Sequence, residues 1–249
     1  MMLRALVKSI VPAPVILGYR RALLHRKRKL NAGRSLPEVF EDVYQRGGWG
    51  GTPGQWCSGS GSAPEQAAGY LAAVAEFVRQ HGVRSVVDLG CGDFRVGAAI
   101  VALGVDYTGV DIVPGLIERN NHLFASERVR FVCLDVTRDA LPDGDLALLR
   151  QVFQHLSNAE IAAALARLNR FRHVLITEHH PAPGRMRAPN VDKPHGGCTR
   201  VVDGSAVCPG EAPFGLPVKP FHEAPVLSPL VATGETLRTY LVTNAAPKK

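Results

Sequence analysis

A glycine turn between a strand-like and a helix-like stretch is the most informative place for chemistry. The string VVDLGCGDF puts Asp88 two residues before a Gly-x-Gly turn that begins at Gly90. Glycine is needed where a backbone turns sharply and lets a ligand approach closely. A dinucleotide-binding turn would have a third small residue where Arg95 stands, and the Lys-Ser/Thr pair of a P-loop does not follow. The turn favours a cofactor without a pyrophosphate, although an ordinary strand-to-helix turn would look the same.

Two more carboxylates follow the next two strand-like stretches. Asp111 and then Asp135 each end such a stretch. Because the carboxyl ends of parallel strands meet at one edge of a sheet, these groups should gather near the glycine turn. There Asp111 is placed to accept both hydroxyls of a ribose, and Asp135 is placed at the edge of an adenine. One Asp at a strand end is often only a helix cap, but three in register indicate a nucleoside site.

The elements that carry these residues alternate between strand and helix. Strands are predicted at 84–88, 106–111, 129–135, 145–150, 173–178 and 236–243. Helices are predicted at 62–81, 95–103, 114–124 and 157–169. Capping boxes at Ser62 and Ser157 open two of these helices. Strands separated by helices give an α/β fold, a doubly wound and mostly parallel sheet with a closing antiparallel strand.

These motifs resemble those of the class I S-adenosylmethionine-dependent methyltransferases over roughly residues 62–180. The matching strings are the Asp88-x-Gly90-x-Gly92 turn, Asp111-Ile112, Asp135-Val136 and Asp145-Leu146. A narrower likeness, to an uncharacterised bacterial branch, depends on Trp49-Gly50 and on the Ser-Gly-x-Gly-Ser segment at 58–62. The resemblance implies a Rossmann-like fold, S-adenosylmethionine as cofactor, and methyl transfer.

The resemblance also implies roles for individual residues. The implied cofactor-binding residues are Asp88, Gly90, Cys91, Gly92, Asp111, Ile112, Asp135, Val136, Gln151, Ser60 and Ser62. The glycine turn would hold the methionine end, Ile112 would pack on the adenine, and Gln151 would lie near the sulfonium. The segment 58–62 is expected to fold over the cofactor as a lid, with a flexible linker as the alternative.

Methyl transfer depends mainly on holding the reactants in line, and a general base adds less. His155 follows the fourth strand and His179 follows the fifth, so both are candidates to take a proton from an oxygen or nitrogen acceptor. The alternative for His155 is a helix-entry residue that bonds the backbone. No metal site is predicted, because the neighbours His179 and His180 would rarely both point at one ion.

The positive charge of the chain lies at its N-terminus. The formal net charge is +7, but residues 1–34 hold nine Lys/Arg and no Asp/Glu, which leaves −2 for residues 35–249. Apolar residues at helical spacing between Leu3 and Val11 make this arm amphipathic. It would either contact an anionic membrane peripherally or dock on its own domain. No specific nucleic acid is expected, because the domain itself offers little to attract phosphates.

Residues 35–249 are predicted to form the methyltransferase domain, in which the Pro- and Gly-rich stretch 181–229 is an irregular substrate region. The expected acceptor is a small molecule or a sugar-like hydroxyl. Five scattered cysteines without a CxxC pair, and no apolar run near about 20 residues, indicate a cytoplasmic protein, with the inner face of the membrane as a peripheral option. The rival hypotheses are a catalytically silent binding module tethered to a membrane and an NAD-dependent dehydrogenase.

Overall fold

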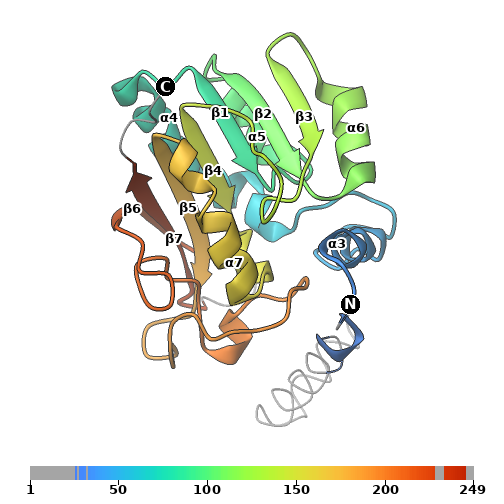
Figure 1. Cartoon of the computed structure of the whole chain (residues 1–249), viewed down its shortest axis with the longest axis vertical. Coiled ribbons are helices and arrows are strands. Elements are labelled where there is room, and N and C mark those ends of the chain that lie inside the picture. Colours follow the sequence, from blue (N-terminus) through green and yellow to red (C-terminus); the bar gives the residue numbers. More distant parts are fainter. Residues whose placement is uncertain (1–25, 27, 32, 228–232, 245–249) are drawn as a thin grey trace.

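A seven-stranded sheet forms the centre of the molecule (Figure 1). The computed structural model describes residues 26, 28–31, 33–227 and 233–244. The strands are β1 (Ser85–Leu89), β2 (Asp106–Asp111), β3 (Val129–Cys133), β4 (Leu146–Arg150), β5 (His173–His180), β6 (Val218–Pro225) and β7 (Thr236–Thr243). Their order is β3-β2-β1-β4-β5-β7-β6, with β1 to β5 parallel and β7 antiparallel to both neighbours. The predicted fold class is confirmed.

Helices cover both faces of this sheet (Figure 1). They are α3 (Leu36–Gln45), α4 (Pro64–His81), α5 (Arg95–Val101), α6 (Pro114–Phe124) and α7 (Asn158–Leu165). The capping box predicted at Ser157 is present, since its hydroxyl accepts from the backbone N–H of Glu160. The one predicted at Ser62 is wrong. Residues Ser60–Ser62 form a 3₁₀ turn instead, and Ala63 precedes Pro64 at the helix start.

Alternation along the strands builds two hydrophobic cores, one on each face of the sheet. Val86 and Leu148 pack on the face covered by α4 and α5. Val87 and Leu149 pack on the opposite face with side chains of α3 and α7. The central strands β1, β4 and β5 are therefore buried on both faces, which fixes their carboxyl ends as a rigid support.

The stretch 181–229 is only partly irregular, because β6 lies within it. Two prolines of β6, Pro220 and Pro225, argued against a strand in the sequence. Proline is tolerated in an edge strand, where a missing N–H need not break a ladder, and β6 is the last strand of the sheet. The register also shifts between Pro220 and His222.

Between β5 and β6, side chains hold the irregular backbone in place of a ladder. Arg200 is 1% exposed, and its guanidinium donates to the carbonyls of Leu156 and Val191. The side-chain amide of Asn190 donates to the carbonyl of Cys208 and accepts from the N–H of the same residue. Buried backbone groups need such partners when no strand supplies them.

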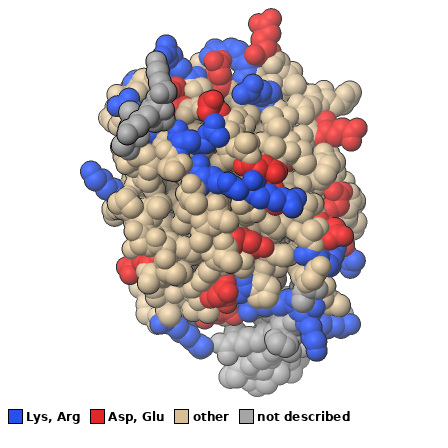
Figure 2. Space-filling view, viewed as in Figure 1, with Lys and Arg blue, Asp and Glu red and all other residues tan. Residues whose placement is uncertain are grey.

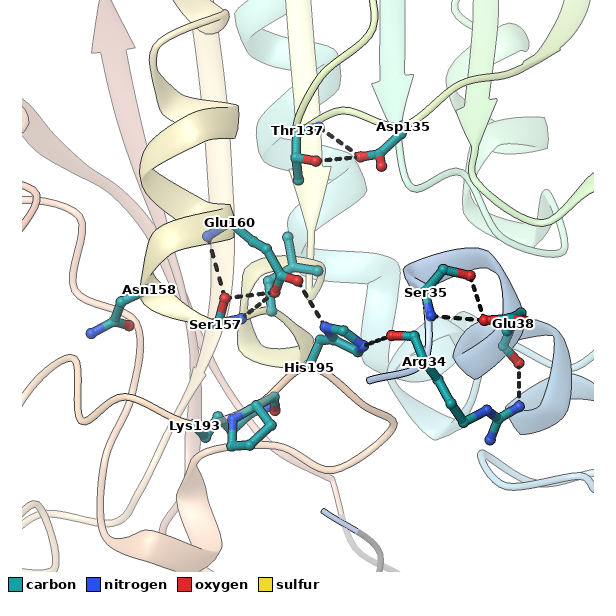
Figure 3. Close-up of polar contacts among 12 residues, drawn as sticks. Arg34, Ser35, Glu38, Asp135, Thr137, Ser157, Asn158, Glu160, Lys193 and His195 are labelled. Carbon is teal, nitrogen blue, oxygen red and sulfur yellow. Dashed lines mark hydrogen bonds and ion pairs between the residues drawn. The ribbon is translucent and has the colours of Figure 1, made fainter. Parts of the chain in front are cut away.

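Helix α3 was not predicted, although the sequence contains its capping box, formed by Ser35 and Glu38. The carboxylate of Glu38 accepts from both the N–H and the hydroxyl of Ser35 (Figure 3). Just before this helix, the carbonyl of Arg34 lies 3.1 Å from Nε2 of His195, whose Nδ1 is 2.7 Å from Oε1 of Glu160. His195 therefore joins the start of α3 to α7 (Figure 3).

The predicted amphipathic stripe at residues 3–11 lies outside the described residues. Nearer the domain, Arg28 forms an ion pair with Asp203 of the segment between β5 and β6. The end of the basic arm thus contacts its own domain. Among the residues that the structure describes, no helix is long and apolar enough to span a bilayer.

Candidate functional site

A cavity of about 440 Å³ opens at the carboxyl edge of the parallel strands. It lies where the strand order reverses between β1 and β4, which is where such sheets bind ligands. Every site residue predicted from the sequence lines it: Asp88, Gly90, Cys91, Gly92, Asp111, Ile112, Asp135, Val136, Gln151, Ser60, Ser62, His155 and His179. The structure thus brings together residues from six separate stretches of sequence.

The glycine turn after β1 depends on both of its glycines. Gly90 and Gly92 have φ of 85° and 56°, in the left-handed region that favours glycine. A Cβ on Gly90 would lie 2.4 Å from Cγ2 of Val152, and one on Gly92 would lie 2.2 Å from Oγ of Ser58. The turn therefore packs too closely against its neighbours for any side chain.

The carboxylate of Asp111 ties this turn to the end of β2. It accepts from the N–H of Gly92 at 3.1 Å and from the N–H of Val113 at 3.2 Å. Burial raises the pKa of Asp111 to about 6, against the lowering effect of these N–H groups. The group is charged at neutral pH, and each oxygen keeps a lone pair for a ligand hydroxyl.

Asp88 lies deeper, at the end of β1. Its Oδ2 accepts from the hydroxyl of Tyr107 at 2.7 Å, and burial raises its pKa to about 6. Asp135 instead turns onto its own loop, where Oδ1 accepts from the N–H and the hydroxyl of Thr137 (Figure 3). Its Oδ2 pairs with Nε of Arg138 at 3.2 Å, so both oxygens of Asp135 have local partners although the residue lines the cavity.

Residues 58–62 cross over the glycine turn. The N–H of Ser58 donates to Oδ2 of Asp93 at 3.0 Å, and the N–H of Asp93 donates back to Oγ of Ser58 at 2.8 Å. At the other end of the segment, a Cβ on Gly61 would lie 2.0 Å from Oε1 of Gln151. The segment thus spans the cavity from β1 to β4. Asp93 was missed in the sequence, although it directly follows the Gly-x-Gly turn.

Gln151 has an unusual backbone at the end of β4. Its φ is +60°, a conformation that non-glycine residues rarely adopt outside functional sites. Its N–H still donates to the carbonyl of Thr177 at 2.7 Å, so the strand pairing with β5 survives the bend. The bend brings the Gln151 side chain against residues 58–62.

His155 is held as a neutral ring. Nδ1 lies 3.2 Å from the carbonyl of Gly196, and Nε2 lies 3.3 Å from the side-chain amide of Gln154. Burial, reinforced by the charge of Lys193, lowers the pKa of His155 to about 3. With Nδ1–H donating to the carbonyl, the ring is a weak base, and these contacts fit the alternative reading of His155 as a backbone-bonding residue at a helix entry.

His179, unlike His155, has a carboxylate as the partner of its ring. Its Nε2 lies 3.0 Å from Oε2 of Glu235, just before β7. Burial lowers the pKa of His179, while Glu235 raises it. A carboxylate that accepts from one ring nitrogen orients the imidazole and leaves the other nitrogen to accept a proton.

Aromatic side chains from α3 and the loop after it form another wall of the cavity. The rings of Tyr44 and Trp49 are 5.0 Å apart and perpendicular, and the rings of Trp49 and His155 are also 5.0 Å apart. Nε1 of Trp49 donates to the carbonyl of Gly197 at 2.9 Å, which fixes the indole. Sequence reasoning assigned no site role to Tyr44 or Phe40 of this wall, and the capping box that begins α3 was the available signal.

Comparison with known proteins shows what part of the chain is similar to a known domain family. Residues 86–173 match a family model described as a methyltransferase domain. No curated protein sequence matches the chain. The matched region contains the glycine turn, Asp111 and Asp135.

Solved structures extend the likeness to the whole fold. Magnesium protoporphyrin IX methyltransferase from Synechocystis PCC 6803, with bound S-adenosylhomocysteine, is 13% identical, with a TM-score of 0.53 over 84% of this chain and 99% of that chain. The 1,6-didemethyltoxoflavin-N1-methyltransferase of Burkholderia thailandensis is 19% identical, with a TM-score of 0.52 over 84% and 88%. Human N-acetylserotonin methyltransferase, at 15% identity and a TM-score of 0.49, is covered over 66% of its length by 92% of this chain. The likeness to the first two structures shows that the chain shares their fold.

Proposed function

We propose that the protein transfers a methyl group from S-adenosylmethionine to an oxygen or nitrogen of a small-molecule acceptor. The observation that carries this proposal is the single cavity that collects the glycine turn and the three strand-end carboxylates. The similar 1,6-didemethyltoxoflavin-N1-methyltransferase acts on a nitrogen, and a candidate base such as His179 suits an oxygen acceptor as well, so both acceptor atoms stay in the proposal.

The residues around the cavity fit this cofactor. The turn at Gly90 and Gly92 has no side chain to block a ligand, and the buried carboxylate of Asp111 has lone pairs left for the two hydroxyls of a ribose. Ile112 and Val136 offer apolar surface for an adenine between them. Segment 58–62, acting as the lid, would exclude water from the methionine end.

When bound, the cofactor supplies an electrophilic methyl group on a sulfonium. The protein's contribution is to hold the acceptor in line with that group, and positioning of this kind is worth effective molarities of about 10⁵–10⁸ M. Gln151, turned inward by its left-handed backbone, borders the methionine end of the cavity. His179, oriented by Glu235, is the residue we assign to take the acceptor's proton.

The acceptor would enter beside the aromatic wall. Phe40, Trp49 and the neutral ring of His155 present flat faces that suit a ring or a sugar face, and Gly197 and Thr199 bring the segment after β5 to the same side. Figure 2 shows one face of the molecule on which basic and acidic side chains are interspersed. On this face side chains of both signs lie between neutral residues, so it is not a uniformly basic surface.

Two narrower assignments belong to the same proposal. The chain would fall within the bacterial branch that carries the Trp49-Gly50 and 58–62 strings, since both strings reach the cavity through Trp49 and through the lid. It would work in a reducing, cytoplasmic compartment, as all five cysteines are unpaired in the described structure. Comparison with purified members of that branch, by the cofactor-binding assay below, tests the first assignment.

Titration calorimetry with S-adenosylhomocysteine and with NAD tests the cofactor. Micromolar binding of the first compound and none of the second is expected; tight NAD binding would replace the proposal with a dehydrogenase, and binding of neither would favour the silent module. A screen with isotope-labelled methyl donor then identifies the acceptor. With that acceptor, His179→Gln should lower kcat by about 10²–10⁴-fold while leaving cofactor affinity unchanged.

A further inference from the structure

Buried polar atoms without partners cluster at the β4 end of the cavity. Arg150 is the last residue of β4, and its Nε and Nη2 are buried with no hydrogen-bond partner. The hydroxyl of Tyr70, from α4, is buried and unpartnered as well. The guanidinium carbon lies 5.2 Å from the centroid of the Tyr70 ring, and both residues line the cavity.

A guanidinium whose buried N–H groups lack hydrogen-bond partners lowers the stability of the folded protein. Arginine has five N–H donors, and a buried donor without a partner destabilises the fold, more so when it is charged. The third nitrogen of Arg150, Nη1, has only a long 3.3 Å contact with Oε1 of Gln151. The ion pairs found among the described residues do not include Arg150. An anionic group in the cavity would supply what the chain does not.

A carboxylate of opposite charge lies on the neighbouring strand. Asp88 of β1 is opposite Leu148 of β4 in register, and Leu148 and Arg150 are two residues apart. Side chains two residues apart in a strand point to the same face, so Asp88 and Arg150 share one face of the sheet. The ion pairs of the described residues do not join Asp88 to Arg150, and the hydroxyl of Tyr107 donates to Oδ2 of Asp88. The cavity therefore presents a negative and a positive group at one end.

We propose that Arg150 binds the α-carboxylate of the cofactor's methionine portion, while Asp88 on the adjacent strand receives its α-ammonium. This inference rests on the proposed function and adds to it the residue that recognises the zwitterionic tail. A guanidinium suits the task because its planar N–H groups match the two oxygens of a carboxylate. The Tyr70 ring supports the guanidinium from one side.

The test compares two ligands that share the adenosine and differ in the tail. S-Adenosylhomocysteine carries the amino-acid group, whereas 5′-methylthioadenosine lacks it. In Arg150→Met, calorimetry should give an affinity for S-adenosylhomocysteine lower by about 10–100-fold, the loss expected for a charged hydrogen bond, and an unchanged affinity for methylthioadenosine. The affinity of Arg150→Lys for S-adenosylhomocysteine should lie between those of Arg150→Met and the unsubstituted protein. Lysine keeps the positive charge but lacks the paired N–H donors of a guanidinium.

Arg130→Met is the matched control, since Arg130 lies on β3, donates to the hydroxyl of Thr108 and does not line the cavity. It should leave both affinities unchanged. Equal affinity of Arg150→Met and the unsubstituted protein for S-adenosylhomocysteine would overturn the inference, and so would an equal loss for both ligands.

A measurement without any variant covers the case in which Arg150→Met does not fold. The unsubstituted protein should bind decarboxylated S-adenosylhomocysteine at least about tenfold more weakly than S-adenosylhomocysteine itself. Equal binding of these two compounds would overturn the inference while leaving the proposed function intact. Failure of the protein to bind either S-adenosylhomocysteine or methylthioadenosine would instead refute the proposed function.

Discussion

The hydroxyl of Tyr44 lies 3.2 Å from Oγ of Ser58, and this contact joins helix α3 to the segment that crosses the glycine turn. The same Ser58 oxygen accepts from the N–H of Asp93, directly after the turn. Three parts of the chain thus meet at one hydroxyl. The cavity is complete only when α3 is docked, because its Leu36, Phe40 and Tyr44 line it.

Replacement of Ser58 should cost more stability than replacement of Tyr44. Ser58→Ala leaves the N–H of Asp93 without its acceptor, which should lower the free energy of unfolding by about 1–3 kcal/mol. Tyr44→Phe removes a single contact and should lower it by about 0.5–1.5 kcal/mol. Urea unfolding monitored by circular dichroism measures both, with Ser60→Ala on the same segment as the control. A larger loss of unfolding free energy in Tyr44→Phe than in Ser58→Ala would contradict the conclusion that the Ser58 hydroxyl joins the three parts of the chain.

The close packing of the glycine turn predicts a difference between two glycines of similar backbone. Gly92→Ala and Gly104→Ala both put a side chain at positive φ, which costs about 1–2 kcal/mol. Only at Gly92 does the new Cβ meet another group, Oγ of Ser58; nothing lies within 4 Å at Gly104. Both variants should lose thermal stability, but Gly92→Ala alone should lose affinity for S-adenosylhomocysteine. Equal affinities would show that the turn does not touch the ligand.

Cofactor affinity should depend on pH through Asp111. Since the pKa of Asp111 is raised to about 6, its carboxylate is charged near pH 8 and protonated near pH 5. Affinity for S-adenosylhomocysteine should therefore be constant above about pH 7 and fall as the pH drops through about 6. Asp111→Asn should bind about 10–100-fold more weakly near pH 8 and show a flatter profile, the remainder coming from Asp88. Exposed Asp106, at the start of the same strand, is the control for Asp→Asn; an unchanged Kd in Asp111→Asn would place the ribose elsewhere.

Acid should destabilise the fold in part through His155. Its pKa falls from 6.5 to about 3 on folding, so the folded state holds it neutral while the unfolded chain takes up a proton. This contribution to stability is complete above pH 6.5 and is lost as the pH falls toward 3, with a slope of up to about 1.4 kcal/mol per pH unit. His155→Asn should flatten the dependence of unfolding free energy on pH between about 6 and 4, whereas replacing exposed His122 of α6 should not. A slope unchanged in His155→Asn would mean that the ring is already charged in the fold.

The basic arm can be tested without disturbing its contacts with the domain. Removal of residues 1–25 keeps the Arg28–Asp203 pair and the contact between Arg34 and His195. If the arm contacts membranes, this truncation should abolish co-sedimentation with anionic vesicles and leave S-adenosylhomocysteine affinity unchanged. Absence of vesicle binding by the full chain would favour the docking alternative.

Local signals in the sequence were enough for most of the sheet and its helices. Helix α6 begins at Pro114 as predicted, and β7 spans Thr236–Thr243 as predicted, since proline at a helix start and a run rich in β-branched residues are local features. Strand β6 was missed because its prolines are acceptable only at a sheet edge. Whether a strand lies at an edge depends on the assembled topology, which no local pattern reveals.

The same limit applies to the site. The predicted residues follow strands and were found because the carboxyl ends of parallel strands share one edge. Tyr44, Tyr70 and Arg150 were not assigned to the site. Tyr44 and Tyr70 approach the cavity from α3 and α4, and the docking of a helix is set by packing across the sheet. Arg150 ends a predicted strand, but only the structure shows that its donors lack partners.

The prolines of β6 also bear on how the molecule meets its neighbours in a crowded solution. A free strand edge normally offers a row of unpaired backbone N–H groups, and a strand of another polypeptide can form hydrogen bonds with them. With Pro220 and Pro225 in the outermost strand and a shift in pairing beside the first, that row is broken at this border of the sheet. This border of the sheet is therefore a poor template for strand pairing with another copy of the chain.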